Sequence, residues 1–223
     1  DFLRFFSDIY TVNYDLLLYW ALLTDPSLEF GDYFNRDEDT PEQYCEYIPD
    51  GAKKKKHVYF LHGGVHLFLK DGRTIKKVWG NTIPLIAQIK QEIENGYYPW
   101  VVAEGDYKAK LEQIKSNPYL DRSYLKLSQN GGQLFTFGFS FSEPDTHIIN
   151  AIVRNPSLRF LWIGIRGNFD EEKNKKLIKL ATKMIRERSD IVGKNNGSKF
   201  GSLEINFYNA GDLDIWGVNK KAD

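Results

Sequence analysis

Polar side chains that could bind a ligand or move a proton follow five runs of strand-forming residues. The five junctions are Thr11–Asp15, Leu61–Gly64, Ala103–Asp106, Phe137–Asp145 and Tyr208–Asp212. In open parallel α/β sheets, ligands bind beyond the carboxyl ends of the strands, so we expect these side chains to share one edge. Asparagine, aspartate, histidine, glutamate and serine beside small residues suit a ligand with hydroxyl and phosphate groups better than an apolar one.

The first three junctions also have ordinary structural explanations. Asp15 directly precedes an apolar run and is well placed to cap a helix, a role that Asn13 could share. His62 could be a histidine at a strand terminus that is hydrogen-bonded to a loop carbonyl. Glu104 could pair with Lys108 one helical turn later. At the level of the sequence, the structural and the catalytic explanations both stay open.

The fourth junction is as compatible with a turn as with a catalytic site. Gly138 and Ser140 could form a tight turn, with Ser142 or Asp145 capping the helix that follows. The run from Gly138 to Ser142 lacks the last glycine of the Gly-x-Ser-x-Gly nucleophile elbow, which argues against a Ser–His–Asp hydrolase. The sequence contains neither a Walker A loop nor a Gly-x-Gly-x-x-Gly motif.

The histidines and the cysteine give no recognisable metal site. His62 and His66 are four residues apart, but a strand is expected between them, so the two side chains would not share a helical face. His57 and His147 add no ligand spacing. Cys45 is the only cysteine, which excludes an internal disulfide and a cysteine-based zinc site. We therefore expect no metal, and a reducing compartment, the cytoplasm.

Composition narrows the class of protein further. The chain has 223 residues, enough for one large α/β domain with a substantial core. Its 30 basic and 30 acidic side chains give a formal net charge of zero, which argues against a protein built to bind nucleic acid or anionic lipid. No apolar run approaches the roughly 20 residues that span a bilayer. Because the sequence begins at Asp1 without a methionine, we expect it to be part of a longer protein.

Strand and helix patterns alternate along the chain. Strands are expected at residues 8–12, 58–61, 65–69, 75–79, 100–103, 134–138, 159–163 and 203–208. Helices are expected at residues 15–23, 84–94, 106–116, 122–128, 145–153 and 170–187. Strands separated by helical patterns of this kind indicate βαβ units and a parallel sheet. The sequence therefore predicts an α/β protein with a Rossmann-like, mainly parallel sheet and helices on both faces.

Three local features complete this prediction. Asp71-Gly72 is expected to form the turn of a hairpin. The helix at residues 15–23 is apolar all round, so we expect it to be largely covered. Residues 1–223 are expected to form a single domain, with a surface insertion at about residues 25–56.

Taken together and in this order, the junctions resemble motifs of the sirtuin-type NAD-binding domain. Thr11–Asp15 resembles the sirtuin Thr-Gln-Asn-Ile-Asp motif, and His62-Gly63 resembles the pair that carries the catalytic histidine. Gly138–Phe141 resembles the Gly-Thr-Ser-Leu motif that faces the nucleotide. The chain is more similar still to a bacterial sirtuin-like family known only as uncharacterised, a resemblance that covers nearly its whole length. The motifs that carry it are Val102–Gly105, Lys110-Leu111, Ile114, Tyr119-Leu120, Gly138–Ile148 and Phe207–Ala210 with Trp216.

Two departures from the sirtuin pattern limit what the resemblance implies. Sirtuin deacetylases insert a four-cysteine zinc module between the His-Gly strand and the Gly-Thr-Ser strand, whereas here Cys45 is the only cysteine and lies earlier. The chain is thus not expected to be a classical zinc-containing deacetylase. The resemblance instead implies the NAD-consuming chemistry of sirtuin-like domains in bacterial antiphage systems. Secondly, the first βα unit of the family, with its glycine-rich phosphate loop, is absent from this sequence, and we expect it before residue 1.

The resemblance assigns catalytic roles to three residues. His62 would be the general base, because its unperturbed pKa near 6.5 suits proton transfer around neutrality. Asn13 would hold the ribose hydroxyls or the attacking water. Asp15 would position the nicotinamide end of the substrate or the loop around it.

Four further residues are assigned to the nucleotide by the same resemblance. Gly138 would let the backbone approach the nucleotide closely, because it has no β-carbon. Ser140 and Asn209 would bond the phosphate or the adenosine ribose. Glu104 belongs to this set without a specific role.

The function implied by the resemblance is hydrolysis of NAD+ to nicotinamide and ADP-ribose, in an antiphage-defence effector. One alternative is a sensor of the same fold that binds NAD or ADP-ribose without turnover, and another is a scaffold whose polar junctions serve only as caps. By analogy with sirtuin-like effectors, and from aromatic residues such as Tyr97-Tyr98, we expect self-association or further domains. Neither a membrane nor a nucleic acid is expected as a partner.

Overall fold

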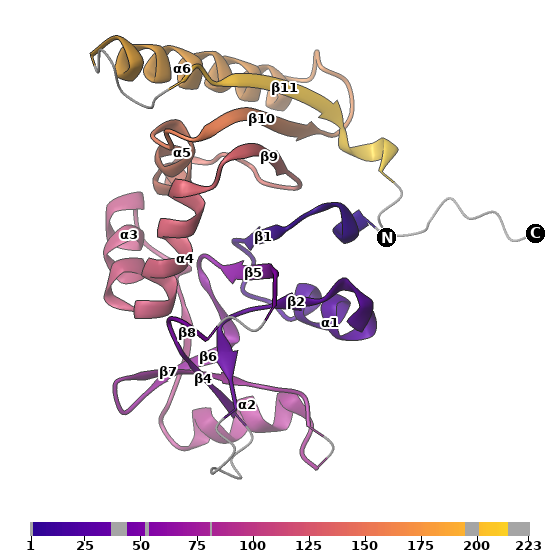
Figure 1. Cartoon of the computed structure of the whole chain (residues 1–223), viewed down its shortest axis with the longest axis vertical. Coiled ribbons are helices and arrows are strands. Elements are labelled where there is room, and N and C mark those ends of the chain that lie inside the picture. Colours follow the sequence, from indigo (N-terminus) through magenta and orange to yellow (C-terminus); the bar gives the residue numbers. More distant parts are fainter. Residues whose placement is uncertain (1, 37–43, 52–53, 81, 195–200, 214–223) are drawn as a thin grey trace, which may run out of the picture. The chain divides into compact units, whose positions relative to one another are not determined.

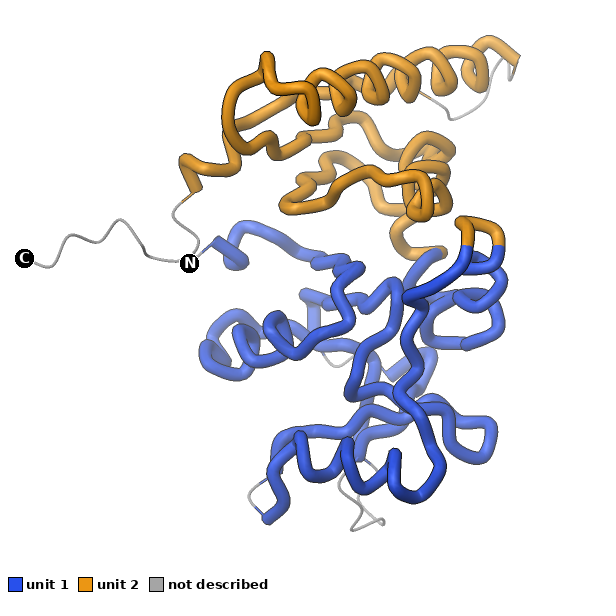
Figure 2. Tube along the Cα trace, turned by 180° about the vertical axis from the view of Figure 1, so that it is seen from behind, with its two compact units in different colours: residues 1–105, 109–124 blue, residues 106–108, 125–223 orange. Residues whose placement is uncertain are grey.

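The computed structural model of the chain describes residues 2–36, 44–51, 54–80, 82–194 and 201–213. These residues form two compact units, which are coloured separately in Figure 2. Unit 1 comprises residues 1–105 and 109–124, and unit 2 comprises residues 106–108 and 125–223. Trp216, one of the residues that carry the sequence resemblance, lies outside the described residues.

A short parallel sheet in unit 1 carries the first two junctions. Its strand order is β1-β5-β2, with β1 at Asp8–Thr11, β5 at Lys56–Phe60 and β2 at Phe30–Gly31. Strand β1 pairs with β5 from Asp8 opposite His57 to Thr11 opposite Phe60. Both strands confirm the expectation from their apolar and β-branched residues.

The second sheet of unit 1 is antiparallel, which corrects the prediction of one mainly parallel sheet. Its strand order is β3-β4-β7-β6-β8. The bounds are Phe34–Asn35 (β3), Tyr44–Tyr47 (β4), Arg73–Lys77 (β7), Gly63–Lys70 (β6) and Pro99–Val101 (β8). The Asp71-Gly72 hairpin is confirmed, with φ of 52° and 79° at its two residues. This hairpin reverses the chain, so the strands beside it pair antiparallel rather than through βα crossovers.

The segment expected as a surface insertion contributes strands and core residues. Strands β2, β3 and β4 all lie between residues 25 and 56. Leu28, Tyr33 and Phe34 are buried, and Phe34 packs in the cluster that contains Phe60. The pattern of prolines and charges hid these apolar residues, because each strand is only two to four residues long.

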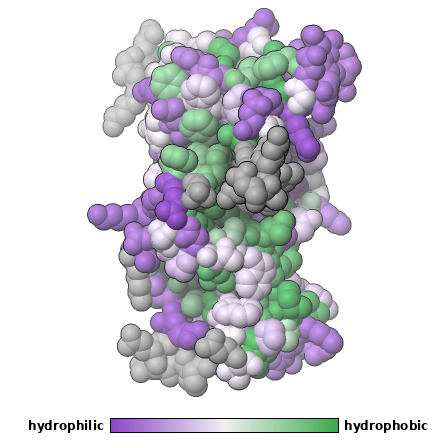
Figure 3. All heavy atoms as spheres, turned by 90° about the vertical axis from the view of Figure 1, so that its right-hand side faces the viewer, coloured by the Kyte–Doolittle hydropathy of each residue, from purple (hydrophilic) through white to green (hydrophobic). Residues whose placement is uncertain are grey.

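Helix α1 (Leu17–Thr24) forms where expected, but it is not largely covered. Tyr19 is its only buried residue, whereas Leu17 and Leu23 are 64% and 42% exposed. Apolar side chains lie open at the surface on the side shown in Figure 3. An all-round apolar pattern therefore predicted the helix correctly and its burial wrongly, because Leu18, Trp20 and Leu22 pack only partly against the core clusters.

Three further helices follow in unit 1 and its connection to unit 2. They are α2 (Leu85–Glu94), α3 (Tyr107–Ser116) and α4 (Pro118–Gln129). Tyr119 of α4 is 1% exposed, and its hydroxyl accepts a hydrogen bond of 3.1 Å from the backbone N–H of Phe60. This bond fixes the end of β5. Tyr97 packs against the core beside α2, whereas Tyr98 is 72% exposed.

Unit 2 contains the second parallel sheet. Its order is β11-β10-β9, with β9 at Gly132–Thr136, β10 at Leu158–Ile165 and β11 at Glu204–Asn209. The helices that connect the strands are α5 (Thr146–Val153) and α6 (Glu172–Lys194), the latter extending along the sheet in Figure 1. Along β10, Leu161 and Ile163 are buried while Phe160 is 37% exposed. Both crossovers advance in one direction, from β9 to β10 to β11, and right-handed crossovers of this kind place their helices on one face of the sheet.

Short 3₁₀ helices complete the described elements. They are η1 (Phe2–Phe5), η2 (Pro26–Leu28), η3 (Glu143–Asp145) and η4 (Ala210–Asp212). The described part of the chain contains no helix that is both long and apolar enough to cross a bilayer.

A buried arginine joins α6 to α5. Arg188 is 1% exposed, and its guanidinium donates to the carbonyl oxygens of Ile152, at 3.3 Å, and Asn155. Burial lowers the pKa of this guanidinium from its ordinary value. The guanidinium thus donates to the carbonyl oxygen of Asn155, just beyond the end of α5, and adds a donor to that of Ile152, which also accepts from the N–H of Asn155.

Replacing Arg188 with alanine should reduce the free energy of unfolding by about 2–4 kcal/mol, because the buried carbonyl oxygen of Asn155 loses this donor and a cavity opens. Urea denaturation of Arg188→Ala measures this loss. The control is Arg186→Ala on the exposed face of the same helix, which should change stability by no more than about 0.5 kcal/mol. Equal losses in the two variants would contradict the role assigned to Arg188.

Candidate functional site

The parallel pairing of β1 with β5 brings the first two junctions to one edge of unit 1. Beyond the last register pair, the N–H of Leu61 donates to the carbonyl oxygen of Thr11 at 2.8 Å. Asn13 and His62 therefore follow neighbouring strands at the same end of the sheet. This part of the sequence-based site is assembled as expected.

The turn after β1 leaves the side chain of Asn13 accessible. The N–H of Asn13 donates to the hydroxyl oxygen of Thr11 at 3.1 Å, which fixes the backbone. Asn13 is exposed, and within the described residues its side-chain amide makes no hydrogen bond. The amide is thus available to donate to one group and accept from another.

Asp15 has a structural role close to the predicted one, but it lies one residue before the N-cap residue of α1, Leu16. Its Oδ1 accepts a hydrogen bond of 2.9 Å from the N–H of Leu17, the first residue of α1. A carboxylate at this place satisfies a free N–H group and interacts favourably with the helix dipole. Asp15 remains exposed, so its second oxygen can still face a ligand.

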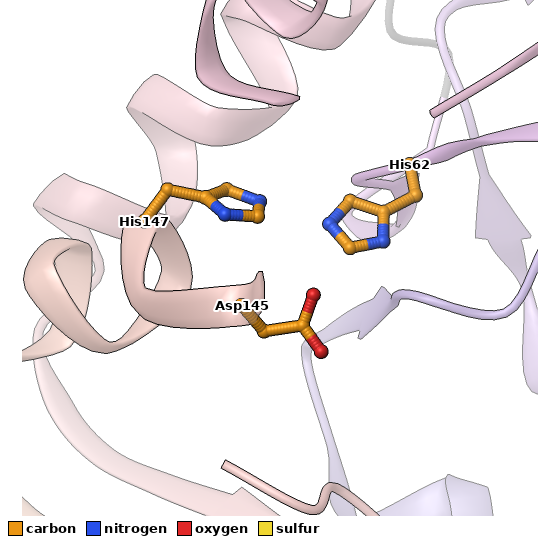
Figure 4. A group of neighbouring side chains, drawn as sticks. All are labelled: His62, Asp145 and His147. Atoms are coloured by element: carbon orange, nitrogen blue, oxygen red, sulfur yellow. The ribbon is translucent and has the colours of Figure 1, made fainter. Parts of the chain in front are cut away.

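His62 lies in the turn that leads from β5 to β6, as Figure 4 shows. It is only 4% exposed. Its carbonyl oxygen accepts a hydrogen bond of 2.9 Å from the N–H of Val102, so the turn is also joined to the segment after β8. Glu104, two residues further along this segment, is exposed. Unit 1 thus brings Glu104 to the edge that carries His62.

Gly63 must be glycine for two reasons. Its φ of 75° lies in the left-handed region, and a β-carbon would lie 2.0 Å from the carbonyl oxygen of Trp100. Because the obstacle is backbone, a side chain could not be accommodated by a rotamer change. The His-Gly pair of the sequence motif is therefore explained by close packing of the turn against β8.

His66 was set aside as a metal ligand in the sequence, and the structure places it beneath this turn. It is completely buried between the rings of Phe60, at 4.9 Å between centroids, and Tyr19, at 5.2 Å. Neither ring nitrogen has a hydrogen-bond partner among the residues that the structure describes. Burial, with a smaller contribution from Lys76, lowers the pKa of His66 to about 3. The spacing Gly-Gly-x-His is the sequence signal that could have identified it.

Unit 2 carries the remaining sequence-based residues. Gly138 has a φ of 66°, and a β-carbon there would meet no atom within 4 Å. Ser140 is exposed after the same strand, β9. Asn209 caps η4: its Oδ1 accepts from the N–H of Gly211 at 3.0 Å, and its Nδ2 donates to Asp212 at 2.8 Å. Because β10 separates β9 from β11, Asn209 does not lie on the strand next to Gly138 and Ser140.

Asp145 and His147 lie at the start of α5, and their side chains extend from the same side of the chain in Figure 4. Asp145 occupies the N-cap position of α5, but its side chain accepts a hydrogen bond of 3.1 Å from the hydroxyl of Ser142 and none from the helix backbone. His147 is completely buried. Both side chains have metal-ligand chemistry, but two ligands on one turn do not by themselves make a site.

A family comparison covers almost the whole chain. Residues 1–216 match the model of the family described as Domain of unknown function (DUF4917). The chain belongs to this family. No curated protein matches the sequence significantly. The sirtuin-like relationship remains a prediction from the motifs.

Membership in the DUF4917 family extends over both units, so the β1–β5 edge and the sheet of unit 2 are both parts of the family domain. The residues of the edge can then be tested one by one. Gly63 and the buried His66 give the first two tests, because their environments are fixed by the backbone and the core.

Alanine at Gly63 should be far more damaging than alanine at Gly72. Both glycines have φ near 77° (75° and 79°), but a β-carbon at Gly72 meets no atom within 4 Å. The left-handed conformation alone should cost Gly72→Ala about 1–2 kcal/mol, and the overlap with Trp100 should add about 1–3 kcal/mol in Gly63→Ala. Chemical denaturation of both variants measures the difference. Similar stabilities would show that the turn is not tightly packed.

The buried imidazole of His66 should make stability depend on pH. Its pKa is about 3 in the folded chain and near 6.5 when unfolded, so unfolding takes up a proton below pH 6.5. The stability that the neutral imidazole confers is therefore fully present above pH 6.5. As the pH falls towards 3, the free energy of unfolding decreases by up to about 1.4 kcal/mol per pH unit. Denaturation of the parent and of His66→Gln at pH 7, 6 and 5 measures it. The difference in the free energy of unfolding between the parent and His66→Gln should shrink as the pH falls. A difference that does not change with pH would contradict a lowered pKa of His66.

Proposed function

We propose that this chain is an NAD+ hydrolase, which cleaves the bond between nicotinamide and ribose. The observation that carries the proposal is the common edge of Asn13 and His62, which follow two neighbouring parallel strands of unit 1. The motif resemblance suggests the ligand. The edge offers a buried imidazole and an accessible amide, the two groups that the attack of water on a sugar carbon requires.

The reaction needs few groups from the protein. The bond between ribose C1′ and the pyridinium nitrogen breaks, and its electron pair neutralises the positive charge of the ring. Water bonds to C1′ through an oxocarbenium-like transition state, as in glycoside hydrolysis. The proton that the water loses needs an acceptor. Because nicotinamide leaves as a neutral molecule, no general acid is required.

His62 is the proposed proton acceptor. Its low exposure of 4% keeps the imidazole out of bulk water, and an imidazole is the side chain best suited to proton transfer near neutrality. Asn13 is proposed to orient the water or the ribose hydroxyls through its accessible amide. Asp15, whose Oδ1 is occupied by Leu17, would direct its Oδ2 towards the nicotinamide end.

The residues assigned to the nucleotide are proposed with less specific roles. Glu104 is available as an exposed carboxylate that can accept hydrogen bonds from hydroxyl groups. Open space beside Gly138 and the exposed hydroxyl of Ser140 are compatible with a phosphate or a ribose. Asn209 is engaged in capping η4, so its backbone is better placed to contribute than its side chain. The role in antiphage defence rests on the resemblance alone.

A sensor that binds NAD or ADP-ribose without turnover is the second candidate. The capping bonds of Asp15 and Asn209 leave fewer polar side chains for catalysis, which is compatible with binding without turnover. Calorimetry with ADP-ribose, together with an assay for nicotinamide release, separates the candidates. A sensor binds ADP-ribose but releases no nicotinamide, whereas a scaffold does neither.

His62→Ala and Asn13→Ala should each reduce nicotinamide release from NAD+ by about 10²-fold or more, in line with the loss of general base or orientation. Chromatographic measurement of nicotinamide from the purified chain tests this. Circular dichroism and thermal melting should show that both variants remain folded.

Matched controls lie elsewhere in unit 1. His57→Ala removes the histidine at the other end of the same strand, where it pairs with Asp8 at 3.4 Å. Asn95→Ala removes an exposed asparagine at the end of α2. Both controls should retain activity within about threefold, well short of the loss expected from removing a catalytic base. Full activity of His62→Ala and Asn13→Ala in an active parent would exclude this site.

A further inference from the structure

His66 lies beneath the β5–β6 turn and has no role in the proposed chemistry. A buried imidazole of this kind is nevertheless unusual in a protein core. Its side chain is completely buried, and neither nitrogen has a partner among the described residues. Burial of polar atoms without partners is costly, and a core position of this kind is usually filled by an apolar residue. A requirement of shape or position would explain why an imidazole is kept here.

The ring of His66 lies directly against Gly64. A β-carbon on Gly64 would be 2.9 Å from Cε1 and 3.0 Å from Nδ1 of the imidazole. Residues 64 and 66 point to the same face of the strand, so the ring folds back along β6 until it reaches the backbone of the turn. A larger six-membered ring would push this backbone outward, and a smaller side chain would leave it unsupported.

The supported backbone connects to both proposed catalytic residues. Gly64 is the second residue of β6 and lies two residues after His62, which is in the turn. The next residue, Val65, donates its N–H to the carbonyl oxygen of Tyr14 at 2.9 Å, and Tyr14 adjoins Asn13. A displacement of Gly64 would therefore be passed to His62 through the turn and to Asn13 through the Tyr14 carbonyl.

We propose that His66 is a positioning residue, whose buried imidazole holds the Gly63-Gly64 backbone at the height that aligns His62 with Asn13. The proposal rests on the function proposed above for its kinetic consequence. The structural part, the support of the turn by the ring, stands on contacts within unit 1 alone. The two parts can therefore be tested separately.

The kinetic test compares His66→Ala with a control in the same core. His66→Ala should reduce kcat for nicotinamide release about tenfold or more while KM changes less than threefold, because alignment rather than binding is lost. Leu85→Ala opens a cavity in the cluster that contains Tyr19, but from helix α2. It should lower the melting temperature at least as much and leave kcat within twofold. Parental kcat in His66→Ala, or an equal loss in Leu85→Ala, would overturn the positioning role.

A double-mutant cycle tests the contact without any assay for NAD. Gly64→Ala should lower the melting temperature strongly in the parent, because the new methyl group meets the ring. In the His66→Ala background the same change should cost less than half as much, because the ring is gone. Equal effects in both backgrounds would show that the ring does not support Gly64.

The imidazole signals of His62 in NMR spectra provide the third readout. His66→Ala should shift these signals and the pKa that they report, whereas Leu85→Ala should leave both unchanged. An inactive parent with these shifts would refute the hydrolase and retain the support of the turn. An active parent without the shifts and without coupling in the cycle would refute the positioning role and retain the hydrolase.

Discussion

The parallel pairing of β1 with β5 is the constraint on which the candidate site depends. Four pairs of residues set its register, and the bond from Leu61 to Thr11 extends it into the turns. A slip by one residue would reverse the side of the sheet to which each following side chain points. The pairing is short, so its stability must come from what surrounds it: Tyr119 accepts a bond from Phe60, and the rings of Tyr10 and Tyr59 stack at 4.9 Å.

The turn after β5 converts this pairing into a fixed position for one imidazole. The two glycines that follow the turn, at the start of β6, pack against different partners: Gly63 against the carbonyl of Trp100 and Gly64 against the ring of His66. The antiparallel sheet of unit 1 supplies both partners, since Trp100 belongs to β8 and His66 to β6. The sequence did not predict this separate antiparallel sheet, yet the sheet supplies the contacts around the junction at Leu61–Gly64 that the sequence singled out.

The sequence predicted the parts of the fold that depend on local pattern. The strands at β1, β5 and β10, the Asp71-Gly72 hairpin and helices α1, α2 and α5 lie where their apolar period and turn residues indicated. The pairing of distant strands was harder to predict from the sequence. Apolar and polar residues alternate in the same way in parallel and antiparallel strands, so the pattern does not reveal the direction of pairing. Short strands such as β3 carry too few residues to show any period, although Phe34 is buried in the core. The apolar helix α1 was found, but its exposure depends on contacts that no local pattern encodes.

For the site, polar residues after strands were a sufficient signal for Asn13 and His62, because strand termini are local features. For Asp15 and Asn209, the sequence could not predict whether the side chain is free or is engaged in a cap. That distinction depends on individual hydrogen bonds, which form only once the tertiary structure places donor and acceptor within bonding distance. His66 was named in the sequence only for its spacing from His62. Its contact with Gly64 became visible with the conformation of the strand between them.

The contact between Gly64 and His66 also bears on how DUF4917 sequences can diverge. In this chain, a β-carbon at position 64 would lie 2.9 Å from the ring of His66, so the ring would have to shift or be replaced by a smaller side chain. We therefore expect substitutions at the two positions to be coupled, with their order set by the size of one ring.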